Sequence, residues 1–154
     1  MRKNVYFLIK RMVDLVVSSL LFVILLIPFV IIAILIKLED GGPVFFKQKR
    51  VGKNLKEFYI YKFRSMKTTR EQFCGELSHE DMVTNIGKVL RKTSIDELPQ
   101  IINVLKGEMT LIGPRPWIPE YYEWFTEEQK RRSDVTPGIS GLAQVKREKS
   151  IGYF

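Results

Sequence analysis

The chain of 154 residues contains one cysteine, Cys74, and one histidine, His79. A single cysteine excludes an internal disulfide, a CxxC redox pair and a cysteine zinc cluster. A single histidine excludes HExxH zinc sites and multi-histidine metal sites. The sequence also contains no Walker A motif and no GxGxxG motif. Its chemistry is therefore sought among the carboxylates and the cations.

Length and composition indicate one folded domain with a basic surface. The chain has 25 Lys+Arg against 17 Asp+Glu, a formal net charge of +8. A hydrophobic share of 45% with 27% charged residues excludes intrinsic disorder. The positive charge suits either a nucleic acid or an anionic membrane surface. We favour the membrane, because a long apolar segment is present, and we expect no nucleic-acid partner.

Residues 15–36 form an uncharged, almost wholly apolar run of 22 positions. As a helix this run would be about 33 Å long, close to the hydrocarbon thickness of a bilayer. The remaining residues are too few to cover such a helix on every side. The run therefore predicts a membrane segment.

Two features bear on how this segment meets the membrane. Pro28 near its middle removes a backbone N–H and favours a bend. Basic residues flank the run on both sides, whereas a simple span usually has one basic end: Arg2, Lys3, Lys10 and Arg11 before it, and Lys37, Lys47, Lys49 and Arg50 after it. A re-entrant hairpin with both ends at one anionic surface and a spanning anchor with a tolerated proline both remain open.

The rest of the chain predicts a small α+β domain. Gly41-Gly42-Pro43 marks the boundary between the membrane segment, over 1–40, and a polar domain over 41–154. Leu98, Ile101, Ile102 and Leu105 form one apolar helical stripe that Gly107 ends. The other expected elements are strands at 44–51 and 58–64, a loop or irregular helix at 65–80, a helix at 82–92, an extended piece at 109–119, a helix at 119–132 and a type II turn at Pro137-Gly138.

Asp96 and Glu97 are the leading candidates for chemistry. One interpretation is structural: Ser94 and Glu97 match a capping box, or Asp96 is the N-cap with Pro99 in the first turn. The functional interpretation is a carboxylate nucleophile beside a second carboxylate at a helix start, where a phosphate could bind. Two adjacent acids could also hold Mg²⁺ together with substrate phosphates.

Arg115 stands between Pro114 and Pro116, and these prolines hold it on a stiff extended backbone. A guanidinium presented in this way suits bidentate phosphate recognition. A solvated arginine in a connecting loop is the alternative. Arg91, shortly before the acidic pair, is either a solvated residue or an anion ligand.

Five ordered motifs carry a resemblance to a known family. They are the basic-flanked apolar segment with Pro28, Tyr61-Lys62-Phe63-Arg64-Ser65-Met66, Ser94-Ile95-Asp96-Glu97-Leu98-Pro99-Gln100, Gly113-Pro114-Arg115-Pro116, and the segment from Pro137 to Val145. From about Lys10 to Val145 the sequence resembles the small monotopic phosphoglycosyl transferases, the bacterial sugar transferases.

The resemblance implies an enzyme on the cytoplasmic face of a bacterial inner membrane, anchored by a re-entrant helix-break-helix. It implies transfer of a phosphosugar from a UDP-sugar to a polyprenyl phosphate, usually undecaprenyl phosphate, with release of UMP. The reaction would require Mg²⁺, pass through a covalent aspartyl-phosphosugar intermediate and begin the membrane steps of glycoconjugate assembly.

By position, Asp96 matches the family nucleophile and Glu97 its partner, implicated in metal binding or in activating the lipid phosphate. Arg115 with Pro114 matches the nucleotide-sugar contact, and Arg91 matches an arginine near the transferred phosphate. We add Lys62 and Arg147 as substrate-binding candidates, although Lys149 competes with Arg147 for the matching position. A second copy of the chain, as a homodimer, is a further candidate partner.

The sequence departs from the family in two places. Ile27 precedes Pro28, where the family usually has serine, so no hydroxyl is present there to satisfy a freed carbonyl. The family also typically continues past this C-terminus with further membrane-associated sequence, so a minimal enzyme, a fragment and a weakly active relative remain open. The alternative to an enzyme is an inactive or scaffold relative, anchored in the membrane, that binds anionic lipid or a partner.

Overall fold

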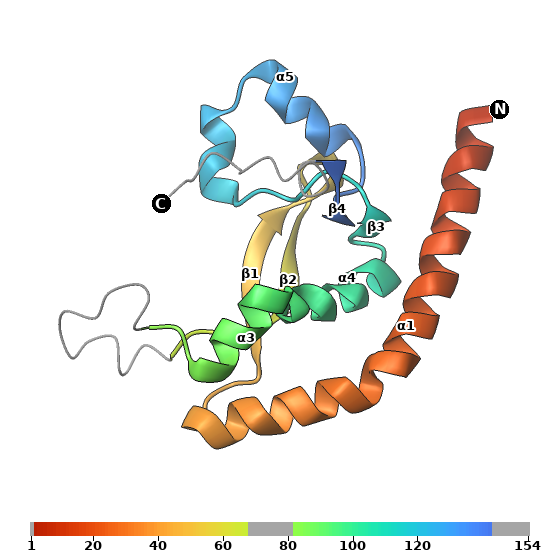
Figure 1. Cartoon of the computed structure of the whole chain (residues 1–154). Helices are drawn as coiled ribbons and strands as arrows, with labels where there is room; N and C mark the ends of the chain where they lie inside the picture. The colour runs from red at the N-terminus through yellow and green to blue at the C-terminus, as the bar shows by residue number, and fades with distance from the viewer. Residues whose placement is uncertain (1, 68–81, 143–154) are drawn as a thin grey trace. The chain divides into compact units, whose positions relative to one another are not determined.

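The structure, a computed structural model, describes residues 2–67 and 82–142 (Figure 1). Its helices are α1 (Arg2–Asp40), α3 (Asn85–Thr93), α4 (Ile101–Lys106) and α5 (Glu127–Lys130), and its strands are β1 (Phe45–Val51), β2 (Glu57–Phe63), β3 (Thr110–Ile112) and β4 (Gly138–Ser140). Short 3-10 helices cover Lys53–Leu55, Ile95–Gln100, Pro119–Trp124 and Arg131–Asp134. β1 pairs with β2, and β3 with β4. The predicted α+β class is confirmed.

The chain folds as two compact units, and each unit is built from separate stretches of the sequence. We call one the β3 unit, made of Met1–Phe22, Gln48–Ile60 and Gln100–Phe154. The other, the α3 unit, is made of Val23–Lys47 and Tyr61–Pro99. The division into a membrane hairpin over 1–40 and a catalytic domain over 41–154 stays a prediction.

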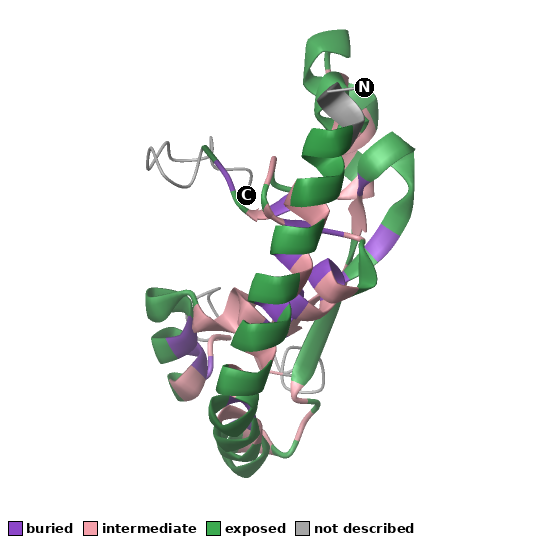
Figure 2. Cartoon of the chain, turned by 90° about the vertical axis from the view of Figure 1, so that its right-hand side faces the viewer, coloured by how far each residue is buried: buried purple, intermediate pink, exposed green. Residues whose placement is uncertain are grey.

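α1 is helical from Arg2 to Asp40, with Pro28 inside it. It is long and apolar enough to cross a membrane, and only 6% of its most apolar 18-residue window is buried (Figure 2). The helix ends at Asp40, and Gly41 after it adopts a φ of +71° and donates its N–H to the carbonyl of Lys37.

In the α3 unit, one stripe of α1 forms part of the core. Phe29 and Ile36 are buried with Phe63 of β2 and Leu90 of α3. The rings of Phe29 and Phe63 meet edge to face, with centroids 5.1 Å apart. The spacing from Phe29 to Ile36 is two helical turns, so one face of an otherwise exposed helix packs against the polar part of the chain.

In the β3 unit, Phe58, Ile60, Val104 and Met109 form the core. β3 and β4 are parallel, with Thr110 opposite Gly138 and Ile112 opposite Ser140. A Cβ on Gly138 would lie 2.1 Å from the backbone nitrogen of Gly113. Only glycine permits this approach.

The predicted apolar stripe at 98–105 is only partly correct. The segment divides into a 3-10 helix that contains Pro99 and the short helix α4, whose buried residues are Ile101, Asn103 and Val104. Ile102 and Leu105 are only partly buried. Asn103 can be buried because its amide donates to the carbonyl of Tyr59 and to a carboxylate oxygen of Glu108, both at 2.7 Å. The C-terminal end at Gly107, with a φ of +86°, is confirmed.

Other local predictions were confirmed or corrected. Both strands of the hairpin and the helix α3 lie close to their expected ranges. The type II turn at Pro137-Gly138 is wrong, because Gly138 has no positive φ and begins β4. The helix expected at 119–132 is divided into α5 and two 3-10 helices. Most of the expected loop at 65–80 lies outside the described residues.

Candidate functional site

Asp96 and Glu97 lie in the first turn of the 3-10 helix Ile95–Gln100, directly after α3. Ser94 ends α3 in the left-handed conformation, with a φ of +58°. An N-cap residue has an extended backbone, so the capping-box interpretation of Ser94 and Glu97 is wrong. The left-handed turn at Ser94 therefore places Asp96 and Glu97 directly after the end of α3.

Glu97 is held by a cation from the β-hairpin. Its carboxylate accepts a hydrogen bond from Nζ of Lys62 on β2 at 2.7 Å. The two side chains are 22% and 17% exposed, so the pair is largely removed from solvent. A charge-assisted bond in such surroundings fixes both side chains more firmly than a surface ion pair would.

Asp96 is half-buried, and its environment disfavours the charged carboxylate. Burial raises the pKa of Asp96 above its ordinary value, and the neighbouring Glu97 charge raises it further. The charges of Lys62 and Arg91 act in the opposite direction and lower the pKa of Asp96. A partly desolvated carboxylate between two cations is more reactive toward an anionic phosphate than a fully hydrated one.

Arg91 is placed by close packing of α3 on the end of the hairpin. Its Nε donates to Oγ of Ser65 at 2.9 Å. A Cβ on Gly87 would lie 2.1 Å from the carbonyl oxygen of Ser65, so only glycine lets α3 approach this strand end. The structure thus brings Asp96, Glu97, Lys62 and Arg91 together in the α3 unit, and we call this set the carboxylate site.

The two carboxylates of the carboxylate site fit a Mg²⁺ ion that is shared with a substrate phosphate. Within residues 2–67 and 82–142, no group of three or more His, Cys, Asp or Glu side chains could hold a metal ion. Asp96 and Glu97 supply two carboxylates, and Mg²⁺ commonly takes one or two together with substrate phosphates and water. These residues would hold the ion jointly with a phosphate rather than as a closed protein cage.

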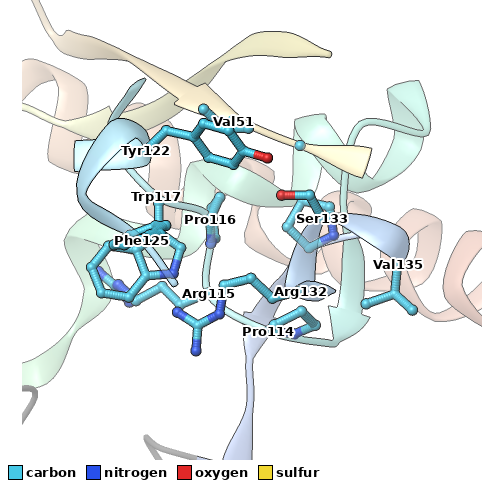
Figure 3. A pocket seen from close by; sticks show the side chains of 12 residues that line it. Val51, Pro114, Arg115, Pro116, Trp117, Tyr122, Phe125, Arg132, Ser133 and Val135 are labelled. Carbon is cyan, nitrogen blue, oxygen red and sulfur yellow. The ribbon is translucent and has the colours of Figure 1, made fainter. Parts of the chain in front are cut away.

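Pro114 and Arg115 belong to the β3 unit, where they line a pocket with aromatic walls (Figure 3). We call this the arginine–aromatic pocket; its lining includes Trp117, Tyr122, Phe125 and Arg132. The close approach of Gly113 and Gly138 fixes the segment that carries Arg115, since the N–H of Gly138 donates to the carbonyl of Pro114 at 2.9 Å. The turn-rich segment after Pro137 therefore supports the proline–arginine motif.

Sequence reasoning missed Arg132. Its guanidinium lies over the ring of Trp117 at 4.8 Å, and Trp117 meets Phe125 edge to face at 4.6 Å. Desolvation lowers the pKa of Arg132 from its ordinary value. No sequence signal pointed to it, because its segment reads as the charged end of the helix expected at 119–132.

Two further predicted site residues are Pro28 and Arg147. Pro28 lies inside α1, in the part that belongs to the α3 unit. Arg147, like its competitor Lys149, lies outside the described residues.

Comparison with known proteins gives a match over almost the whole chain. Residues 5–153 match the family described as bacterial sugar transferase. The chain is 41% identical over 146 residues to "Uncharacterized sugar transferase EpsL" of Bacillus subtilis (strain 168), which covers 95% of this chain and 72% of that protein.

The names of two longer relatives state the reaction that each catalyses. A UDP-N-acetylgalactosamine-undecaprenyl-phosphate N-acetylgalactosaminephosphotransferase of Aeromonas hydrophila is 48% identical over 147 residues, which cover 92% of this chain and 34% of that protein. A UDP-glucose:undecaprenyl-phosphate glucose-1-phosphate transferase of Escherichia coli (strain K12) is 41% identical over 143 residues, 90% of this chain and 31% of that protein. The chain thus spans about a third of the length of these two proteins.

Proposed function

The chain belongs to the bacterial sugar transferase family, and from that premise we propose that it is a phosphoglycosyl transferase. It moves a sugar phosphate from a UDP-sugar to a polyprenyl phosphate such as undecaprenyl phosphate, and UMP is released. The family resemblance drawn from the ordered motifs is confirmed. The named relatives support the donor and acceptor classes.

One observation carries the proposed chemistry. Asp96 is half-buried beside Lys62, Arg91 and Glu97, and burial raises the pKa of this carboxyl. In the first step, an Oδ of Asp96 forms a bond to the phosphorus that bears the sugar. The bond from that phosphorus to the bridging oxygen breaks, and UMP leaves with the electron pair.

In the second step, a phosphate oxygen of the polyprenyl acceptor attacks the same phosphorus. The bond to Asp96 breaks, the carboxylate is restored, and the sugar now stands on a lipid diphosphate. Lys62 and Arg91 offer positive charge to the phosphoryl group in both steps, because phosphoryl transfer is catalysed mainly by positioning and by electrostatic stabilisation. Glu97, fixed by Lys62, orients the site.

Asp96 and Glu97 would hold Mg²⁺ together with the donor phosphates. When bound, the ion neutralises charge on the diphosphate and makes UMP a better leaving group.

The arginine–aromatic pocket is proposed to bind the nucleotide end of the donor. Arg115 is exposed at this pocket and can form a bidentate contact with a phosphate of the nucleotide. This assignment extends the role that the resemblance gave to Pro114 and Arg115.

Contacts at the N-terminal part of α1 bear on membrane topology. The helix and the undecaprenyl-phosphate relatives indicate membrane association. Within the β3 unit, the guanidinium of Arg11 donates to the carbonyls of Val104 and Leu105 at 2.7 and 3.2 Å. The carboxylate of Asp14 accepts from the hydroxyl of Thr110 and from the backbone N–H of Leu111.

Contacts at the other end of α1 follow the same pattern within the α3 unit. Glu39 accepts from the backbone N–H groups of Asn85 and Ile86 at the start of α3, and Asp40 pairs with Arg64. The N-terminal end of the helix is thus bonded to polar segments of the β3 unit, and its C-terminal end to polar segments of the α3 unit. The chain crosses between the polar segments of the two units without a second apolar run, so we favour the re-entrant, monotopic arrangement. The basic flanks favour the cytoplasmic face.

The proposed function is tested by UMP release from a panel of UDP-sugars, with polyprenyl phosphate and Mg²⁺ present. We expect release with at least one donor, and mass spectrometry of donor-treated protein should find a phosphosugar adduct on Asp96. Release of UMP without any adduct on Asp96 would contradict the covalent route. No release with any UDP-sugar would favour the inactive or scaffold alternative.

The topology is tested by cysteine labelling in a Cys74→Ser background, with one cysteine placed at either terminus. We expect both termini to be labelled from the same side of the membrane. Labelling from opposite sides would contradict the re-entrant arrangement.

A further inference from the structure

A second cavity lies in the β3 unit, between the N-terminal part of α1 and the loops around β3. Its volume is 440 Å³, and from α1 it is lined by Tyr6, Phe7, Lys10, Arg11 and Asp14. From other segments its lining includes Lys53, Thr110, Pro114 and Val135. Only Pro114 and Val135 are shared with the arginine–aromatic pocket. We call it the helix-start cavity.

The helix-start cavity has an excess of positive charge. Lys10, Arg11 and Lys53 face a single acid, Asp14, and that acid is buried and already accepts from Lys10 and Thr110. Arg11 is used by the carbonyls at the end of α4. The ammonium of Lys53 has no hydrogen bond or ion pair with the described residues, and it lies over the ring of Phe7 at 5.8 Å. Within residues 2–67 and 82–142, no side chain therefore occupies this ammonium, which leaves it able to bind an anion.

The apolar surface beside this charge indicates what kind of anion fits. Tyr6 and Phe7 are 61% and 54% exposed, and Leu8 and Ile9 beside them are also exposed. The charged positions 10, 11 and 14 directly precede the uncharged run at 15–36. Charged and aromatic side chains at the edge of an apolar helix lie at the level of the lipid headgroups.

We propose that the helix-start cavity binds the phosphate-bearing headgroup of an anionic membrane phospholipid. Lys53, with the remaining donor capacity of Lys10, contacts the phosphate, while Tyr6 and Phe7 contact the glycerol and the first part of the acyl chains. The volume lies within the range of small-molecule sites. The proposal concerns a lipid that is not a substrate, and it holds whether or not the chain transfers sugar phosphate.

The test is native mass spectrometry of the full chain in detergent, titrated with phosphatidylglycerol or with phosphatidylcholine. We expect stronger retention of phosphatidylglycerol. Lys53→Gln should weaken that retention about fivefold, which corresponds to about 1 kcal/mol for one lysine near an anionic headgroup. Lys53→Arg should retain it, because a guanidinium also binds phosphate.

Lys56→Gln is the matched control, because it removes the same charge from the same exposed loop at a position that does not line the cavity. Equal losses in Lys53→Gln and Lys56→Gln would show general surface attraction and overturn the proposal. Equal retention of the two lipids would also overturn it. Displacement of phosphatidylglycerol by inorganic phosphate would assign the cavity to a free phosphate, and displacement by UMP would assign it to the donor site; either result overturns the lipid assignment.

Discussion

The carboxylate site and the arginine–aromatic pocket are built by different means. In the carboxylate site, side-chain polar contacts fix the charged groups: Glu97 is paired with Lys62, and Arg91 donates to the hydroxyl of Ser65. In the arginine–aromatic pocket, backbone contacts and ring packing do this work, through Gly113 with Gly138 and through Trp117 with Phe125. In the proposed function the first site carries out the reaction and the second binds the donor, and this division can be tested by changing each site in turn.

The largest effect is expected from Asp96→Asn, which removes the proposed nucleophile. UMP release should fall by at least about 10⁴-fold, as for loss of a nucleophile in other covalent enzymes. A continuous UMP assay with purified protein in lipid measures this. Residual release within tenfold of the unchanged protein would show that Asp96 is not the nucleophile.

The same variant should fold normally. The pKa of Asp96 is raised in the folded state, so the folded chain binds this proton more tightly than the unfolded chain does. The stability that follows is present at low pH and is lost as pH rises through the raised pKa, so the ionised carboxylate costs stability at pH 7. The Tm of Asp96→Asn at pH 7 should therefore equal or exceed that of the unchanged protein, and a lower Tm would contradict the argument.

A smaller loss is expected from Arg115→Ala in the arginine–aromatic pocket. Loss of one charge-assisted contact to a phosphate should lower kcat/KM for the UDP-sugar by about 10²-fold. The adduct on Asp96 should still form at saturating donor, because the carboxylate site is intact. Steady-state kinetics over a range of donor concentrations measures the first effect, and unchanged kcat/KM would remove Arg115 from the donor site.

Gly138→Ala tests the backbone support of the same pocket. The new Cβ would lie 2.1 Å from the backbone nitrogen of Gly113, so β3 and β4 must move apart. We expect a loss of about 1–3 kcal/mol in the free energy of unfolding, as for overpacked sites. Gly41→Ala is a useful contrast, since no atom lies within 4 Å of its Cβ and only its φ of +71° opposes the change. Equal free energies of unfolding for Gly138→Ala and the unchanged protein would show that the approach of Gly138 to Gly113 does not contribute to stability.

The smallest effect is a shift in pH dependence within the carboxylate site. In the proposed mechanism the ionised Asp96 is the reactive form, so activity should fall as pH drops through the pKa of this group. Lys62→Met removes a charge that lowers this pKa, so the acid limb of kcat should move to higher pH. Glu97→Gln removes a charge that raises it, so the limb should move to lower pH. Shifts in the same direction would contradict the electrostatic assignment, whatever the absolute rates.

The sequence predicted those features that depend on local patterns. The apolar run at 15–36 lies within one long helix, and Gly107 ends α4 as predicted. The role of the adjacent acids Asp96 and Glu97 stays a prediction. The hairpin strands were visible as aromatic segments bounded by turn residues. In each case neighbouring residues alone determine the structure.

Features that depend on distant contacts were not predicted. Ser94 fits a capping pattern, yet it adopts a left-handed conformation at the end of α3. The buried stripe through Phe29 and Ile36 cannot be distinguished within a uniformly apolar run, because only packing on Phe63 and Leu90 selects it. Arg132 became a site candidate only through its position over Trp117.

The contacts at both ends of α1 have a consequence for the choice of host membrane. A helix that must reach the far surface has to match the local hydrocarbon thickness, and a mismatch costs free energy for every ångström. In the proposed re-entrant arrangement the helix would enter and leave through one leaflet and sense only the depth of that leaflet. Such a protein should work equally well in thin and thick bilayers.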